Sequence, residues 1–308
     1  MFVTLIAVAA LWGAATGLLV PRAAYRLSVE PGEPWRDRCP AGHALTGPAG
    51  GWLGAPLCRT CGAEARPIGS RIQVGAVSLE AEPEPRSESE SESRPESEPD
   101  RLPGPEFEPE PETEPQPDPD PDPETSDPLR PTAPALLTAL VCALLAAATG
   151  PRPELVVWLL YAPFAVLLAS VDVRVHRLPD GLTLPLAAAT PSLLGAAALL
   201  PYDAGSWGHA LLGALALGGA YLVLFLINPG GMGFGDVKLA LSLGAALGWY
   251  GWGILFAGAF AGFLLGSLYG LGLILSRRGG RKAAIPFGPF MLGGALLGLL
   301  LGALSATP

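Results

Sequence analysis

Acidic residues are scarce in most of this 308-residue sequence. Residues 80–127 hold 19 of the 28 acids and 3 of the 19 basic residues, a net charge of −16. The remaining 16 basic and 9 acidic residues carry +7. The overall charge of −9 therefore describes one insert, so it says nothing about acidic substrates. We predict no nucleic-acid partner.

Apolar residues are almost absent from the same insert, which alternates Glu, Pro and Ser. Such a segment cannot bury enough surface to offset its chain entropy, which excludes a packed domain. Proline and self-repelling charge keep it extended. We predict a disordered acidic linker over residues 79–131, and the sequence leaves open whether it is a solvated spacer or a docking segment.

Long apolar runs make up most of the remaining sequence, and a run of about 20 residues can cross a bilayer. The prediction is an all-α polytopic membrane protein with about eight transmembrane helices. The predicted domains are a first transmembrane helix over 1–21, a cytoplasmic Cys/His segment over 22–78, the linker, and a seven-helix membrane domain over 132–305. The predicted spans lie near 2–20, 132–150, 154–171, 182–200, 207–228, 237–250, 252–275 and 285–305.

Basic residues predict which side of the membrane each loop faces. Arg22 and Arg26 follow the first apolar run instead of preceding it, which favours an uncleaved span with its N-terminus outside. Counting spans from there places the loops 21–131, 172–181, 229–236 and 276–284 in the cytoplasm. Most basic residues of the membrane domain fall in or beside these loops, as the positive-inside rule requires. They are Arg174, Arg177, Lys238, Arg277, Arg278, Arg281 and Lys282.

Glycine recurs every four residues in one predicted span, at Gly258, Gly262, Gly266 and Gly270. This spacing places the four glycines on one smooth face of a helix. Such a face lets another transmembrane helix approach closely. We interpret the repeat as packing and not as chemistry.

Only five acids occur from residue 131 onward: Glu154, Asp172, Asp180, Asp203 and Asp236. Glu154 and Asp203 fall in outer loops, whereas the other three fall at the cytoplasmic edge, where ionisable groups are functional candidates. Two carboxylates that approach closely share one proton, and such a pair can activate water and protonate a leaving amine. Alternatively, these acids are hydrated interfacial residues or form ion pairs with Arg174, Arg177 or Lys238.

Three short segments resemble one family. "GFGDVKL" at 233–239 resembles the Gly-x-Gly-Asp motif of intramembrane aspartyl proteases. "SVDVRVHRLPDGLTLP" at 170–185 and "PFGPF" at 286–290 resemble further segments of the bacterial type IV prepilin peptidases, in the same order. The resemblance covers about residues 135–305. It implies that Asp172 and Asp236 are catalytic and that Gly233, Gly235, Lys238, Pro179 and Asp180 support the motifs.

The resemblance also implies an activity and a location. It implies a membrane aspartyl endopeptidase in a bacterial plasma membrane that removes the short basic leader of prepilins or pseudopilins at the cytoplasmic face, without a cofactor. We expect Asp180 to cap the following helix, and Gly233 and Gly235 to let backbone approach closely. An ion-coupled transporter and a catalytically silent assembly scaffold for pili or secretion remain alternatives.

Cysteine is scarce, and three of the four cysteines lie within 39–61. Cys39, His43, Cys58 and Cys61 form a C-x3-H…C-x2-C pattern that suits a structural zinc ion, and disulfides are rare in the cytoplasm. Alternatively, the three cysteines are unrelated. The resembled family often has four cysteines here, and its bifunctional members methylate the new N-terminus with S-adenosylmethionine. Because His43 replaces one cysteine and the linker interrupts the segment, the sequence does not assign methylation.

Deleting residues 80–127 tests the prediction for the linker. A disordered spacer supplies no catalytic group, so leader removal by the purified protein in detergent should stay near the wild-type rate. The measurement is the rate of substrate cleavage, with membrane insertion as the control. A severe loss of cleavage with normal insertion would show that the linker docks a partner or the substrate.

Overall fold

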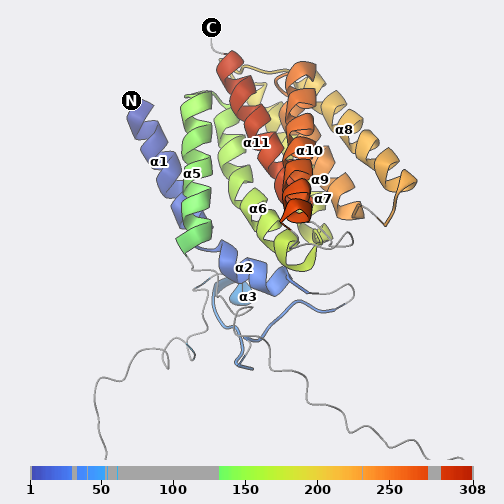
Figure 1. Cartoon of the computed structure of the whole chain (residues 1–308). Coiled ribbons are helices and arrows are strands. Elements are labelled where there is room, and N and C mark those ends of the chain that lie inside the picture. The colour runs from blue at the N-terminus through green and yellow to red at the C-terminus, as the bar shows by residue number, and fades with distance from the viewer. Residues whose placement is uncertain are drawn as a thin grey trace, which may run out of the picture. The chain divides into compact units, whose positions relative to one another are not determined.

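The computed structural model describes residues 2–29, 33–39, 41–52, 54, 61, 132–230, 232–276 and 286–306. These residues form helices and one isolated antiparallel bridge between Arg38 and Ala44. The predicted linker and Cys58 lie outside the described residues. The helices, shown in Figure 1, are α1 (Phe2–Gly17), α2 (Val20–Leu27), α3 (Pro48–Gly51), α5 (Thr132–Thr149), α6 (Glu154–Val175), α7 (Asp180–Ala197), α8 (Trp207–Ile227), α9 (Phe234–Gly248), α10 (Trp252–Leu275) and α11 (Gly288–Ser305).

The predicted all-α membrane fold is confirmed, since each of the eight predicted spans is helical over most of its length. Six stretches of the described residues are long and apolar enough to cross a membrane by themselves: Phe2–Leu27, α5, α6, α8, α10 and α11. The other two predicted spans, α7 and α9, do not meet this criterion. Helix α9 has 15 residues and is therefore about 22 Å long, against about 30 Å for the hydrocarbon core.

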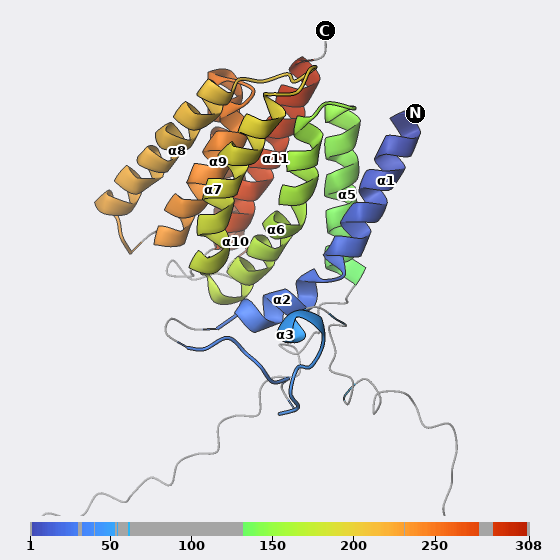
Figure 2. The ribbon, with the colours of Figure 1, turned by 180° about the vertical axis from the view of Figure 1, so that it is seen from behind.

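Helix α9 is enclosed by other helices. It packs against α7, α8, α10 and α11, and 11 of its 15 residues are buried. Figures 1 and 2 show α9 between these neighbours from both sides. Because protein surrounds it, α9 can be short and rich in Gly and Ala without exposing its backbone to lipid.

Helix α2 connects the Cys/His segment to α6. Its apolar side packs against Val166, Leu167 and Val171 of α6. Arg22 and Arg26, which are both buried, donate to backbone carbonyls of residues 46–51. The guanidinium of Arg26 also lies 4.2 Å from the centroid of the Trp52 ring. The Cys/His segment is therefore attached through α2 to the end of α6 (Figure 2).

The predicted glycine face of α10 packs against α11. A Cβ atom added at Gly262 would lie 3.1 Å from the carbonyl oxygen of Phe290, and one added at Gly258 would lie 3.3 Å from that of Gly294. On the facing helix, a Cβ added at Gly294 would overlap the backbone nitrogen of Gly262. These contacts confirm that α10 and α11 approach each other through glycine.

The Gly294→Ala substitution should destabilise this packing. The new methyl group meets backbone atoms that cannot rotate away, and overpacking of this kind costs about 1–3 kcal/mol. Gly219→Ala in α8 is the matched control, because a Cβ there has no neighbour within 4 Å and alanine is the better helix former. Thermal unfolding in detergent measures both, and a Gly294→Ala protein that melts at or above the wild-type temperature would contradict this packing.

Candidate active site and candidate metal site

Asp172 lies in the last turn of α6, and its side chain is buried. Its Oδ2 accepts a hydrogen bond of 2.9 Å from the backbone N–H of Gly288, the first residue of α11. The first N–H groups of a helix lack partners within the helix and carry a partial positive charge, so they suit a carboxylate. A Cβ at Gly288 would lie 2.8 Å from that oxygen, so a side chain here would force the carboxylate to shift.

The carboxylate of Asp236 also lies at the start of a helix, in this case its own helix α9. It is buried in the first turn, and its Oδ2 accepts a hydrogen bond of 3.2 Å from the N–H of Gly233. A Cβ at Gly235 would lie 2.8 Å from the Cβ of Leu178, so Gly235 lets α9 approach the α6–α7 loop. A Cβ at Gly233 would have only ordinary contacts, the nearest at 3.6 Å. Close approach to other protein segments thus occurs at Gly235 and not at Gly233.

The fold brings the two carboxylates together across 64 residues of sequence. Asp172 and Asp236 interact electrostatically, and each carboxylate accepts a backbone N–H at the start of a helix, α11 or α9 respectively. Tyr221 of α8 also interacts electrostatically with Asp236, and its ring packs 6.2 Å from that of Phe287. The site therefore collects groups from α6, α8, α9 and the start of α11.

Two residues of this site were missed by sequence reasoning. Gly288 lies within the quoted "PFGPF" segment, but the sequence gives no sign that its N–H faces a carboxylate. Tyr221 stands among aliphatic residues of a predicted span, where one aromatic residue does not signal a site.

Asp180 and Lys238 link the two motif segments. Lys238 Nζ of α9 lies 2.6 Å from Asp180 Oδ1 at the start of α7. The prediction that Asp180 caps α7 is wrong. Pro179 occupies the N-cap position, Asp180 is the first helical residue, and no side chain caps the helix. The carboxylate has a cationic partner on another helix instead.

The alternative of ion pairs for the two buried acids finds no support in the described part of the chain. There the ion pairs are Arg152 with Glu154 and Lys238 with Asp180. Neither includes Asp172 or Asp236. The backbone N–H groups of Gly288 and Gly233 stabilise these two carboxylates in place of a cation.

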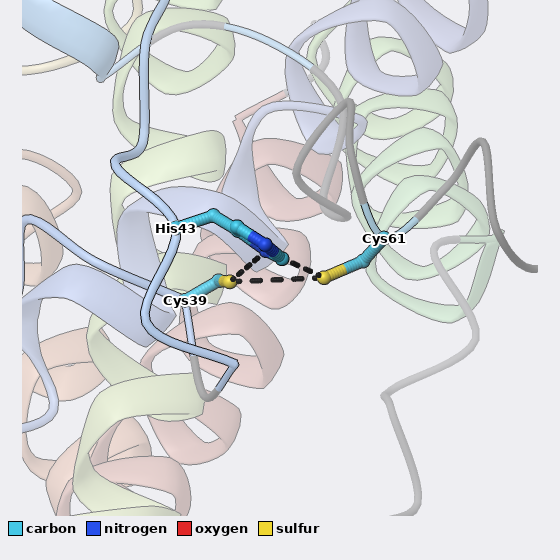
Figure 3. A group of neighbouring side chains, drawn as sticks. All are labelled: Cys39, His43 and Cys61. Atoms are coloured by element: carbon cyan, nitrogen blue, oxygen red, sulfur yellow. Dashed lines mark hydrogen bonds between the residues drawn. The ribbon is translucent and has the colours of Figure 1, made fainter.

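Three of the four predicted metal ligands lie together (Figure 3). The Sγ atoms of Cys39 and Cys61 are 3.7 Å apart, which is too long for a disulfide bond. His43 Nδ1 lies 3.7 Å from Cys39 Sγ and 3.4 Å from Cys61 Sγ. The turn that carries Cys39 and His43 is closed by a hydrogen bond from the Cys39 N–H to the His43 carbonyl. These three residues could hold a metal ion, and the fourth predicted ligand, Cys58, lies outside the described residues.

Curated proteins similar to this chain share one name, prepilin leader peptidase/N-methyltransferase. That of Aeromonas salmonicida (strain A449) is 36% identical over 177 residues, which cover 54% of this chain and 56% of the relative. That of Bacillus subtilis is 33% identical over 168 residues, covering 53% and 64%. That of Klebsiella pneumoniae is 34% identical over 125 residues, covering 40% and 54%. The chain thus spans little more than half the length of the curated relatives it matches.

The match to a protein family agrees with the names of these relatives. No solved structure matches the chain significantly. The model of the type IV leader peptidase family matches residues 159–276, which include both buried carboxylates and the Lys238–Asp180 pair. The six long apolar helices agree with a multi-pass membrane protein. Residues 159–276 of this membrane domain are therefore similar to the type IV leader peptidase family.

Proposed function

We propose that this chain is a membrane aspartyl endopeptidase that removes the short leader of prepilins or pseudopilins. The observation that carries the proposal is the pair of buried carboxylates of Asp172 and Asp236, which come from different helices and interact electrostatically. The names of the relatives support the choice of substrate. Both carboxylates lie within the residues that match the family.

Two interacting carboxylates of this kind can hydrolyse a peptide bond, because they can share one proton. In each carboxylate, Oδ2 accepts a backbone N–H, so the other oxygen is available for water or substrate. One carboxylate is ionised and accepts a proton from water as the water oxygen attacks the carbonyl carbon. The protonated partner donates its proton to the carbonyl oxygen. The tetrahedral gem-diol intermediate then collapses. One of its hydroxyls gives its proton to the ionised carboxylate, the protonated carboxylate gives its proton to the nitrogen, and the C–N bond breaks, which releases the amine and restores the singly protonated pair.

We place the site at the cytoplasmic face of a bacterial plasma membrane. Asp172 lies in the last turn of α6, where α6 packs against α2. Asp236 lies in the first turn of α9, and its neighbour Gly235 approaches Leu178 of the α6–α7 loop. The basic residues Arg174 and Lys238 occur at this same end, as the positive-inside rule requires of a cytoplasmic side. A transporter would place its acids near the membrane midplane, whereas these two acids lie in terminal turns of their helices.

We further propose that Cys39, His43, Cys58 and Cys61 hold a structural zinc ion. Tetrahedral zinc with its usual bond lengths separates two sulfurs by about 3.8 Å and a sulfur from a nitrogen by about 3.6 Å. The 3.7 Å between sulfurs, and the 3.7 and 3.4 Å from sulfur to nitrogen, agree with this geometry. Four protein ligands leave no position for a water molecule, so the ion stabilises the segment and does not hydrolyse the substrate.

S-adenosylmethionine would be needed only for a second reaction, methylation, in which it is the methyl donor. The printed names of the relatives include an N-methyltransferase activity. We do not assign it to this chain, because His43 stands where the resembled segment has a cysteine.

The Asp172→Asn and Asp236→Asn substitutions should each abolish leader removal, because each removes one half of the shared-proton pair. Asp180→Asn should retain substantial cleavage, since its carboxylate is 63% exposed and exposed ion pairs contribute little. Mass spectrometry of a co-expressed prepilin measures cleavage, with membrane insertion as the control. Normal cleavage by Asp172→Asn together with loss of cleavage in Asp180→Asn would show that the wrong acid has been assigned. Normal cleavage by both Asp172→Asn and Asp236→Asn would favour a scaffold.

Protein purified without chelator should contain about one zinc per chain, the stoichiometry of a single structural site. Cys61→Ser should lower the zinc content and increase protease sensitivity around residues 36–66, because it removes a ligand. Cys142→Ala in α5 is the control, since Cys142 is buried away from the ligand group. Elemental analysis measures the zinc, and wild-type protein without any zinc would refute the site.

A further inference from the structure

An apolar groove runs along α6 toward its last turn, which carries Asp172. Its volume is about 260 Å3, and side chains of α5, α6, α9 and α11 line it. On α6 the lining extends from Trp158 to Ala169, which spans roughly 16 Å of helix. Ala169 and Asp172 are three residues apart and share one face of α6. On the opposite wall the groove reaches Pro289, the neighbour of the glycine that donates to Asp172.

The polar atoms of the aromatic lining residues face protein partners. Tyr161 Oη is 2.9 Å from Ser242 Oγ, and Trp158 Nε1 donates to Tyr250 Oη at 3.3 Å. Their rings line the groove, while the remaining lining residues are aliphatic or small. The groove therefore offers its occupant an apolar surface that needs no hydrogen bond, as expected of a site for an apolar segment within a membrane.

We propose that this groove holds one face of the apolar helix that follows the cleavage site of the substrate. The proposal rests on the proposed function and adds the place where the substrate binds. The lining of the groove ends at Ala169 and at Pro289, the neighbour of the glycine that donates to Asp172. An apolar helix lying along the groove would therefore point the peptide bond at its end toward Asp172. The apolar walls would also accept a lipid acyl chain, but a bound lipid would not explain why the groove runs toward Asp172.

The dimensions of the groove determine how the substrate lies. A helix with its side chains is about 10–12 Å across, so a cavity of this volume takes side chains and not a whole helix. Ala165 and Ala169 are half-buried and four residues apart, a spacing of small residues that lets another helix come close. The groove length corresponds to roughly 11 helical residues. Substrate residues within about three turns of the cut therefore contact the enzyme.

Filling the groove tests the proposal. Ala165→Phe and Ala169→Phe place a ring in the groove, and Ala147→Phe on the exposed side of α5 is the matched control. Each variant is given a full-length prepilin and a short soluble peptide that contains the leader and the cleavage site but lacks the apolar helix. The groove variants should lower kcat/KM for the prepilin by about tenfold or more and change that for the peptide by about twofold or less. The control variant should cleave both substrates as the wild type does.

The outcomes separate this inference from the proposed function. Wild-type protein that cleaves neither substrate would refute the proposed function. Active wild-type protein with groove variants that cleave the prepilin normally, or that lose both substrates equally, would overturn the groove proposal alone.

A photocrosslinking residue in place of Leu292 gives a second readout that needs no turnover. Leu292 lines the groove on α11. In an Asp236→Asn background, the crosslink should join the enzyme to the apolar helix of the prepilin, and unlabelled prepilin should compete. Crosslinks to lipid only would overturn the proposal.

Discussion

The structure depends on hydrogen bonds from backbone N–H groups to two carboxylates that are removed from water. Burial of an ionised carboxylate in apolar surroundings is costly unless donors replace the lost water. For Asp172 the donor is the N–H of Gly288 at the start of α11, and for Asp236 it is the N–H of Gly233 just before α9. This requirement fixes where α9 and α11 begin. It also explains a glycine at position 288, where a side chain would force the carboxylate to shift.

The positions of the helices could be predicted from the sequence, because apolar runs are local signals. The acids alone left three candidates at the cytoplasmic edge, and the choice of Asp172 and Asp236 rested on the family resemblance. Long-range contacts could not be predicted. Arg22 and Arg26 were interpreted only as signs of a cytoplasmic loop. The structure shows their guanidinium groups bonded to carbonyls 24 to 29 residues away. Asp180 was assigned to a cap because its position before an apolar run suits one, yet its carboxylate pairs with Lys238 of α9. Neither pairing follows a repeating spacing that could be recognised in the sequence.

Helix α2 joins the candidate metal site to the candidate active site. On one side it donates hydrogen bonds to the segment that holds Cys39 and His43, and on the other it packs against Val171, the residue before Asp172. The two sites thus share a helix without sharing a ligand. A metal ion that orders the Cys/His segment would thereby also restrict the end of α6 and the position of its carboxylate.

The short length of α9 determines how deep Asp236 lies in the membrane. If the aromatic residues Trp249 and Tyr250 after its last turn lie at the outer interface, a helix of about 22 Å ends about 8 Å short of the other edge of a 30 Å hydrocarbon core. Asp236, the third residue of α9, then lies about 11 Å below that edge, which the proposed function places on the cytoplasmic side. On the proposed function, water needs no pore to reach this carboxylate from one surface, and the barrier to ions across the rest of the membrane stays intact.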